Sequence, residues 1–263
     1  MNVTLNGRRL ACLALALVLG IGLAAATHAQ TVLVDFGSNS SFRGVSVPAP
    51  DMNGHYWNSL TPGPFYADLV DINNAATTID LGYDTPVGTD SYNGPAGPTS
   101  IPPTAGELAA TDIDAAALGN LGVTQAAFDF AASPGGLNNN TRFQIQGLDP
   151  NKKYTLTLFG SHKFSDDSTT VYTVFNSGTY TTAIGTANLQ IQDPMSPWLH
   201  NRDKVATIGG LSPDASGILY VQFVGNTGNQ GYLNSFQLTG VPEPASFALV
   251  SLALVAAAGI RRR

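Results

Sequence analysis

The sequence predicts a mainly β protein, with a single β-sandwich over residues 30–240 and an apolar helix at each end of the chain. Two observations favour strands in the central part. Short runs of Val, Ile, Leu, Tyr, Phe and Thr are separated by Gly, Pro, Asn and Asp, and several runs alternate apolar with polar side chains. A central part of about 210 residues is long enough for one sandwich with a proper core. We therefore expect one domain.

The first 29 residues predict a cleaved secretory signal. Arg8 and Arg9 precede an apolar run over residues 10–26, and residues 27–29 (Thr-His-Ala) offer the small side chains that a signal peptidase recognises. The run is short and rich in Ala, which favours a cleaved signal over a retained anchor helix. Signal peptidase is thus an expected partner, and Gln30 is the expected first residue of the mature chain.

The last residues, 241–263, predict a short membrane helix with a basic end. An apolar stretch covers residues 246–260 and would span about 22 Å as a helix, slightly less than a bilayer core. Basic residues beside such a helix stay on the cytoplasmic side. The flanking polar motif and basic cluster consist of Pro242, Glu243, Pro244, Arg261, Arg262 and Arg263.

This order of motif, helix and basic cluster resembles the PEP-CTERM sorting signal of Gram-negative bacteria that make exopolysaccharide. The resemblance implies that an exosortase cuts near Pro242-Glu243-Pro244, so that the membrane anchor is transient and the protein reaches the cell surface or the extracellular matrix. The alternative is an ordinary tail anchor, which would need no Pro-Glu-Pro motif.

Six runs in the central part are expected to be strands, and one stretch interrupts the β pattern. Residues 107–122 are rich in Ala and Leu and predict a short helix, with Thr111 or Asp112 placed to cap its start and Gly119 placed to end it. The preceding residues, 93–103, are rich in Pro and predict a loop. The expected strands are residues 32–36, 143–145, 154–159, 170–174, 218–223 and 233–238.

Several segments resemble a β-sandwich module of secreted proteins from biofilm-forming bacteria. They are the Asp-Phe-Gly after the first strand, Tyr-Trp-Asn at 56–58, GLDPNKKYTLTLFGS at 147–161, a Thr-Thr-Val-Tyr strand, SPDASG at 212–217 and YLNSFQL at 232–238. The resemblance implies a galactose-binding-like jelly roll, in which the first and last strands are neighbours. One departure is Ser161-His162, where the family has Ser-Arg, so no role of that arginine is transferred.

Charge and cysteine content exclude two classes of function. Without the two end segments the chain keeps seven basic and 17 acidic side chains, a net charge of about −10. Nucleic acid is therefore not an expected partner, because phosphates would be repelled. The single cysteine, Cys12, lies in the signal, so disulfides and thiol catalysis are not expected in the mature protein.

No catalytic constellation stands out, and we expect no enzymatic activity. Ser161, His162 and the Asp166-Asp167 pair have the residue types of a hydrolase triad, but they lie within seven positions and cannot easily converge. A glycosidase needs two facing carboxylates, and Glu107 is the only glutamate of the central part. It precedes the expected helix, where an acidic side chain complements the helix dipole.

The sequence predicts no metal site, although a structural calcium ion is left open. The histidines of the central part are too far apart in sequence to suggest zinc. Oxygen side chains that calcium could use crowd one region, but no loop signature orders them, so we expect turn residues and a domain that folds without metal. The region contains Asp68, Asp71, Asn73, Asp80, Asp84 and Asp90.

Two aromatic segments are candidates for carbohydrate binding. A sugar ring stacks on an exposed aromatic side chain beside polar groups that bind its hydroxyls. The candidates are Trp57, in Tyr-Trp-Asn, and Trp198 with His200, Asn201 and Arg202. Either tryptophan can instead fill the core, because a sandwich of this size has use for both. We expect Trp57 to belong to the core and regard Trp198 as the better ligand platform.

Three functions fit these observations. The first is a non-catalytic surface or matrix protein that binds exopolysaccharide. The second is a secreted polysaccharide-active hydrolase, which would need two carboxylates converging in a cleft. The third is a structural adhesin or coat protein, which would lack any groove for a sugar.

Overall fold

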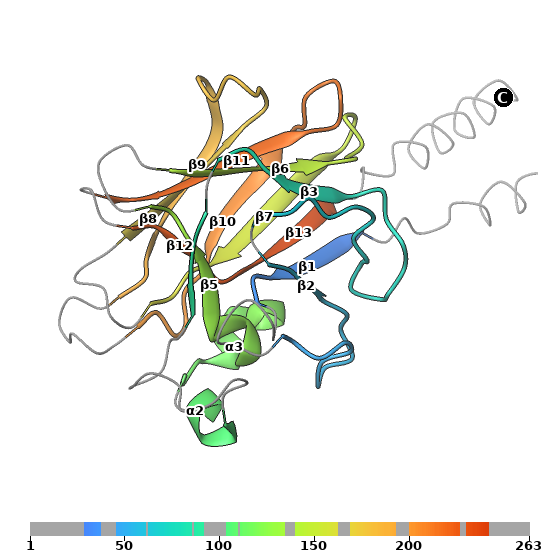
Figure 1. The fold of residues 1–263 in the computed structure, drawn as a ribbon. Coiled ribbons are helices and arrows are strands. Elements are labelled where there is room, and N and C mark those ends of the chain that lie inside the picture. The colour runs from blue at the N-terminus through green and yellow to red at the C-terminus, as the bar shows by residue number, and fades with distance from the viewer. Residues whose placement is uncertain are drawn as a thin grey trace, which may run out of the picture.

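The computed structural model has a mainly β fold (Figure 1). The described residues are 29–37, 46–61, 63–85, 87–91, 104–109, 111–134, 140–162, 169–192, 200–226 and 230–241. Both predicted end signals lie outside these residues, except for Ala29 and Val241, and so does Trp198. Among the residues that the structure does describe, no helix is long and apolar enough to cross a membrane.

Two five-stranded sheets form the body of the protein. The first has the strand order β10-β7-β13-β1-β2, and the second has the order β3-β6-β11-β8-β9. In the first sheet β1 pairs antiparallel with β13 and parallel with β2. The first and last described strands are therefore neighbours, as the resemblance to a jelly roll implies. The strands of the first sheet are β1 (Thr31–Asp35), β2 (Asn58–Ser59), β7 (Lys153–Phe159), β10 (Ala206–Leu211) and β13 (Ser235–Val241).

The second sheet is antiparallel throughout, and a small third sheet, in the order β12-β5-β4, joins the end of the sandwich. The strands of the second sheet are β3 (Asp80–Tyr83), β6 (Thr141–Gln146), β8 (Thr169–Phe175), β9 (Ala183–Gln190) and β11 (Leu219–Gly225). Those of the third sheet are β4 (Gly88–Ser91), β5 (Asp129–Ala132) and β12 (Tyr232–Leu233).

The main core lies between the two large sheets, so the fold is a β-sandwich. Alternation decides which side chains enter it: in β6 the buried residues are Thr141, Phe143 and Ile145, and the residues between them are partly exposed. Phe143 of the second sheet stacks on Phe236 of the first, with ring centroids 6.0 Å apart and an interplanar angle of 19°. The two sheets thus bury their facing apolar sides against each other.

A helical layer covers the outer face of the first sheet. It contains α3 (Ala115–Leu118), η1 (Gly119–Leu121) and η2 (Gln125–Ala127), and Figure 1 shows α3 and α2 (Ala105–Ala109) together at one end of the sandwich. Leu118 and Leu121 pack with Leu33 of β1 in a second apolar cluster. Because a helical layer lies on one side and the main core on the other, β1 is buried on both faces.

The predicted helix over residues 107–122 is divided, and its cap differs from the prediction. Asp114 caps α3 by accepting hydrogen bonds from the amides of Ala116 and Ala117, both at 3.1 Å. Asp112, one of the two predicted caps, instead adopts a left-handed backbone with φ 51° and binds Arg202. Gly119 ends α3 with φ 60°, as predicted, because a glycine adopts this conformation without strain.

All six predicted strands are present, with one interruption. The stretch predicted as one strand over residues 233–238 is divided at Asn234 into β12 and β13. The side chain of Asn234 donates to the carbonyls of Ala127 and Asp129, at 3.1 and 2.8 Å, and accepts from the amide of Ser161 at 2.7 Å. Asn234 therefore joins three segments, and its backbone carbonyl receives the amide of Phe36 at 3.0 Å.

Aspartates of the acidic region between positions 68 and 84 serve mainly as turn and surface partners. Asp71 accepts from the amides of Asn73 and Ala75, both at 2.8 Å, which is an Asx-type turn. Asp80 accepts from the amide of Asp68 at 2.8 Å, and Asp84 accepts from Gln144 and Tyr180. In the part of the chain that the structure describes, no group of three or more His, Cys, Asp or Glu side chains could hold a metal ion.

Candidate functional site

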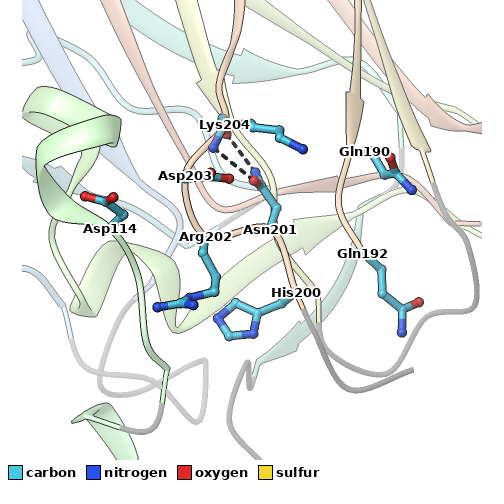
Figure 2. Close-up of a pocket in the computed structure, with 8 residues that line it drawn as sticks. All are labelled: Asp114, Gln190, Gln192, His200, Asn201, Arg202, Asp203 and Lys204. Atoms are coloured by element: carbon cyan, nitrogen blue, oxygen red, sulfur yellow. Dashed lines mark hydrogen bonds between the residues drawn. The ribbon is translucent and has the colours of Figure 1, made fainter. Parts of the chain in front are cut away.

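A polar pocket of about 380 Å³ lies where the segment 200–204 meets the end of β9 and the cap of α3. Figure 2 shows the eight lining side chains, which come from three parts of the chain. All eight are polar or charged, so the pocket offers hydrogen-bond donors and acceptors rather than an apolar surface. The lining residues are Asp114, Gln190, Gln192, His200, Asn201, Arg202, Asp203 and Lys204.

The backbone of this segment is held to the two residues that follow β9 in the chain. His200 forms an antiparallel bridge with Gln192, and the amide of Asn201 donates to the carbonyl of Ile191 at 2.9 Å. These contacts place Gln192 and His200 on neighbouring stretches of chain, where both line the pocket. His200 is 5% exposed, so most of its ring is covered.

Asn201 shapes the segment, although it was predicted as a ligand-binding residue. Its side-chain amide donates to the carbonyls of Gly160 and Lys204, at 3.0 and 2.7 Å, and its side-chain oxygen accepts from the amide of Lys204 at 3.0 Å. The dashed lines in Figure 2 mark the two bonds between Asn201 and Lys204. Because these bonds occupy its polar atoms and the residue is buried, Asn201 holds the turn that presents its neighbours.

Arg202 joins the segment to the helical layer. Its guanidinium donates to the Asp112 carboxylate at 2.7 Å and to the Asp112 carbonyl at 2.9 Å. The carbonyl of Arg202 accepts from the amide of Asp114 at 2.9 Å. The ion pair is largely exposed, so its contribution to stability is small, about 0–1 kcal/mol. Its main effect is to fix the orientation of the guanidinium at the edge of the pocket.

The remaining charges of the pocket are exposed. Asp203 and Lys204 lie next to Arg202 in sequence; Asp203 is exposed and Lys204 largely so. Asp114 faces the same pocket while its carboxylate caps α3. The pocket therefore combines two acidic and two basic side chains with two glutamines, a set suited to binding the hydroxyl groups of a neutral ligand.

Trp57, the other candidate for carbohydrate binding, does not line this pocket. Its side chain is 5% exposed and packs with Leu33, Val47 and Leu118. The indole Nε1 donates to Oδ2 of Asp51 at 3.0 Å. The ring therefore has no free face on which a sugar could stack, in agreement with its expected place in the core.

The residues of the rejected hydrolase triad have other partners. Ser161 is fully buried, and its hydroxyl donates to the carbonyl of Asn201 at 2.9 Å. The ring of His162 stacks on Tyr232, with centroids 4.3 Å apart and an interplanar angle of 9°. Asp166 and Asp167 lie outside the described residues. A buried serine whose hydroxyl binds a backbone carbonyl is not placed to attack a substrate.

The structure brings together His200, Asn201 and Arg202, and it adds five residues that the sequence reasoning missed. Asp203 and Lys204 directly follow the predicted segment and could have been included on that ground. Nothing in the sequence points to Gln190, Gln192 and Asp114, because they reach the pocket through strand pairing and helix placement.

A scan against protein-family models and a search of curated proteins both found no match.

Proposed function

We propose that this chain is a non-catalytic exported protein of the cell surface or extracellular matrix that binds polysaccharide through the pocket at residues 200–204. The observation that carries the proposal is the lining of the pocket: eight polar side chains surround about 380 Å³, a volume in the range of small-ligand sites. Sugar hydroxyls need many donors and acceptors, and amides and charged groups supply them.

The export part of the proposal rests on the sequence. The expected signal peptide, the Pro242-Glu243-Pro244 motif and the basic end resemble the two targeting signals of a PEP-CTERM protein of a Gram-negative bacterium. The neighbouring first and last strands and the two facing sheets support a jelly roll of the galactose-binding-like kind. Signal peptidase and an exosortase would then be transient partners.

Removal of both ends is the first expected result. The natively secreted protein should lack residues 1–29 and Arg261, Arg262 and Arg263, because each end carries the charge flank that its processing machinery needs. Intact-mass spectrometry of the protein released by its own cells measures this directly. A mass that includes the three arginines would show a plain membrane anchor instead.

The binding site is tested by two matched double variants of the full chain. Asp203→Ala with Lys204→Ala removes one acidic and one basic side chain from the pocket. Asp149→Ala with Lys152→Ala removes the same two charges from a distant exposed turn, where they form an ion pair at 3.6 Å. A glycan array identifies a polysaccharide that the unchanged protein retains, and affinity electrophoresis then compares the variants.

We expect the pocket variant to bind about tenfold more weakly or worse, since hydrogen bonds to charged groups contribute about 1.5–3 kcal/mol each. The turn variant should bind as the unchanged protein does. Equal binding by both variants would remove the pocket from consideration. Retention of no glycan by the unchanged protein would favour the structural adhesin, and release of reducing ends would favour the hydrolase.

Trp198 is predicted to add an aromatic platform beside His200. It lies two residues before the pocket segment in sequence, outside the described residues. In the same assay, Trp198→Ala is a third variant: a ligand platform requires weaker retention with an unchanged melting temperature, because an exposed ring leaves no cavity when it is removed. A large loss of stability would assign the ring to the core.

A further inference from the structure

A row of three polar side chains crosses the first sheet at the end of β1. Asp35 lies opposite Ser235 of β13 and in register with Ser59 of β2. Residues directly opposite each other in paired strands point to the same face of the sheet. The carboxyl group of Asp35 is therefore flanked by a hydroxyl group from the strand on each side.

This row lies on the covered outer face of the sheet rather than in the main core. Leu33, two residues before Asp35, packs with Trp57 and Leu121 under the helical layer. Side chains two positions apart in a strand share a face, so Asp35 points into the same layer. Asp35 and Ser235 are both 0% exposed, and the hydroxyl oxygen of Ser59 is buried although the residue is partly exposed. The polar atoms of the row are therefore shielded from bulk water.

A second buried carboxylate lies on the same side of the sheet as these three side chains. Asp129, the first residue of β5, is 0% exposed. A Cβ atom built on Gly37 would lie 2.4 Å from both carboxylate oxygens of Asp129. Only a glycine fits there, and the Asp129 carboxylate thus lies over the chain two residues beyond Asp35. The two groups interact: burial, and then the charge of Asp35, raises the pKa of Asp129.

Five buried oxygen atoms of these residues have no hydrogen-bond partner in the part of the chain that the structure describes. They are Oδ1 of Asp35, both carboxylate oxygens of Asp129, and the hydroxyl oxygens of Ser59 and Ser235. The hydroxyl of Ser59 lies near enough to Asp35 to favour its charged form, but without good hydrogen-bond geometry. The second oxygen of Asp35 accepts only a long bond, 3.3 Å, from the amide of Val47.

Protonation alone does not satisfy this cluster. A proton on Asp129 could be shared with Asp35, but the hydroxyl oxygens of Ser59 and Ser235 would still have no partner, and each unpaired buried polar group costs about 1–3 kcal/mol. The two ion pairs found among the described residues, Lys152–Asp149 and Arg202–Asp112, involve neither carboxylate. The hydroxyl groups of Ser59 and Ser235 each carry a proton, but neither has an acceptor in hydrogen-bond geometry. Most buried polar groups in folded proteins are paired, so five buried oxygens without partners, three of them from carboxylates, point to a cation.

We propose that Asp35, Asp129, Ser59 and Ser235 form a buried calcium site. The candidate ligands are all oxygens, which calcium and magnesium prefer, and they include no nitrogen or sulfur for zinc. Two carboxylates balance the charge of one divalent cation. Magnesium keeps several of its waters, whereas this position is closed to solvent, so calcium fits it better. Five protein oxygens approach the coordination number of about six to eight that calcium takes.

Such an ion would tie four strands together. The residues come from β1, β2, β13 and β5, so the ion would link the first and last described strands to the small third sheet. The site is distinct from the acidic turn region between positions 68 and 90, where the sequence left calcium open. Calcium binding here would run against the expectation that the domain folds without metal.

The test is calorimetric titration of the full chain, stripped with EDTA, against CaCl₂, with thermal melts at increasing Ca²⁺. We expect one calcium ion per chain and a melting temperature that rises with the Ca²⁺ concentration, because binding to the folded state alone stabilises it by mass action. MgCl₂ at the same concentrations should have a much smaller effect. A chain that releases no heat and melts at the same temperature in EDTA and in Ca²⁺ would overturn the proposal.

Isosteric variants locate the ion. Asp129→Asn keeps the size of the side chain and removes its charge, so it should fold in EDTA and lose the response to Ca²⁺. Ser235→Ala should weaken calcium binding by about tenfold or more, as loss of metal-supporting groups does. Asp71→Asn, in the exposed Asx turn, is the matched control and should bind as the unchanged chain does. An unchanged calcium affinity in Asp129→Asn would place the ion elsewhere and overturn the site.

Discussion

Replacement of Trp57 by alanine is expected to destabilise the folded protein by about 3–5 kcal/mol. The indole is 5% exposed and lies in the apolar cluster between β1 and the helical layer. Its removal leaves a cavity and deprives Oδ2 of Asp51 of a hydrogen bond of 3.0 Å. Urea denaturation followed by tryptophan fluorescence and circular dichroism measures the free energy of unfolding of each variant.

Two control variants separate the contributions. Trp57→Phe keeps most of the packing and loses the hydrogen bond, so we expect a cost of about 1–3 kcal/mol, the penalty of the unpaired Asp51 oxygen. Phe65→Ala removes an aromatic ring that is 57% exposed, and its cost should stay within about 0.5 kcal/mol. A cost below about 1 kcal/mol for Trp57→Ala would mean that the ring is accessible, and Trp57 would return to the candidate sugar-binding residues.

In the absence of calcium, the free energy of unfolding is expected to decrease as the pH rises from about 4 to about 8. Burial raises the pKa of Asp35 to about 8, although the Val47 amide and the Ser59 hydroxyl act in the opposite direction. An aspartate in the unfolded chain has a pKa of about 3.9. Between these two values the folded state holds a proton that the unfolded state has released, so stability is lost as the pH increases.

The groups around Asp35 either add to this loss of stability with rising pH or carry no charge. Asp129 is the titratable group that faces Asp35, and its pKa is also raised, while β2 and β13 contribute the neutral Ser59 and Ser235. Each unit of pKa shift corresponds to about 1.4 kcal/mol, so the loss over this pH range is on the order of a few kcal/mol. Urea denaturation in EDTA at pH 5 and at pH 8 measures the difference.

Asp35→Asn should flatten this pH profile, because its side chain cannot titrate, and the exposed Asp71→Asn should leave the profile unchanged. Saturating calcium should also remove much of the slope, since a bound cation holds both carboxylates in their charged form. Equal stability at pH 5 and pH 8 in EDTA would show that Asp35 and Asp129 do not take up protons on folding.

Several of the strands that sequence reasoning identified show a strong alternation of large side chains with smaller or polar ones. Val171, Val221 and Phe223 belong to such runs in β8 and β11, where one face is buried and the other is partly wet. The strands that it missed have a weaker pattern. β9 reads AIGTANLQ and β10 reads ATIGGL, and their small residues resemble loop sequence. They become strands because β9 pairs with β8 and β10 pairs with β7, and this pairing is decided by the tertiary structure.

The division of the last predicted strand has a similar cause. Nothing in the local pattern of Tyr-Leu-Asn-Ser-Phe-Gln-Leu requires a break at Asn234. The break follows from three hydrogen bonds between the Asn234 side chain and segments more than 70 residues away in sequence.

The sequence does contain a signal for the buried position of Asp35. This acidic residue ends an apolar run, and the strand is covered on both faces.

The sequence by itself determined the β class, the main strands, the acidic character and the absence of cysteine from the central part, because these depend on composition and on local alternation. Only the tertiary structure decided which polar residues meet. Pairing between β1, β2 and β13 aligns Asp35 with Ser59 and Ser235, and the position of β5 brings the Asp129 carboxylate against Gly37, two residues after Asp35. The pocket depends likewise on the bridge between Gln192 and His200 and on the placement of α3. Both groups of residues come together through contacts between parts of the chain that are far apart in sequence, and no local sequence pattern encodes such contacts.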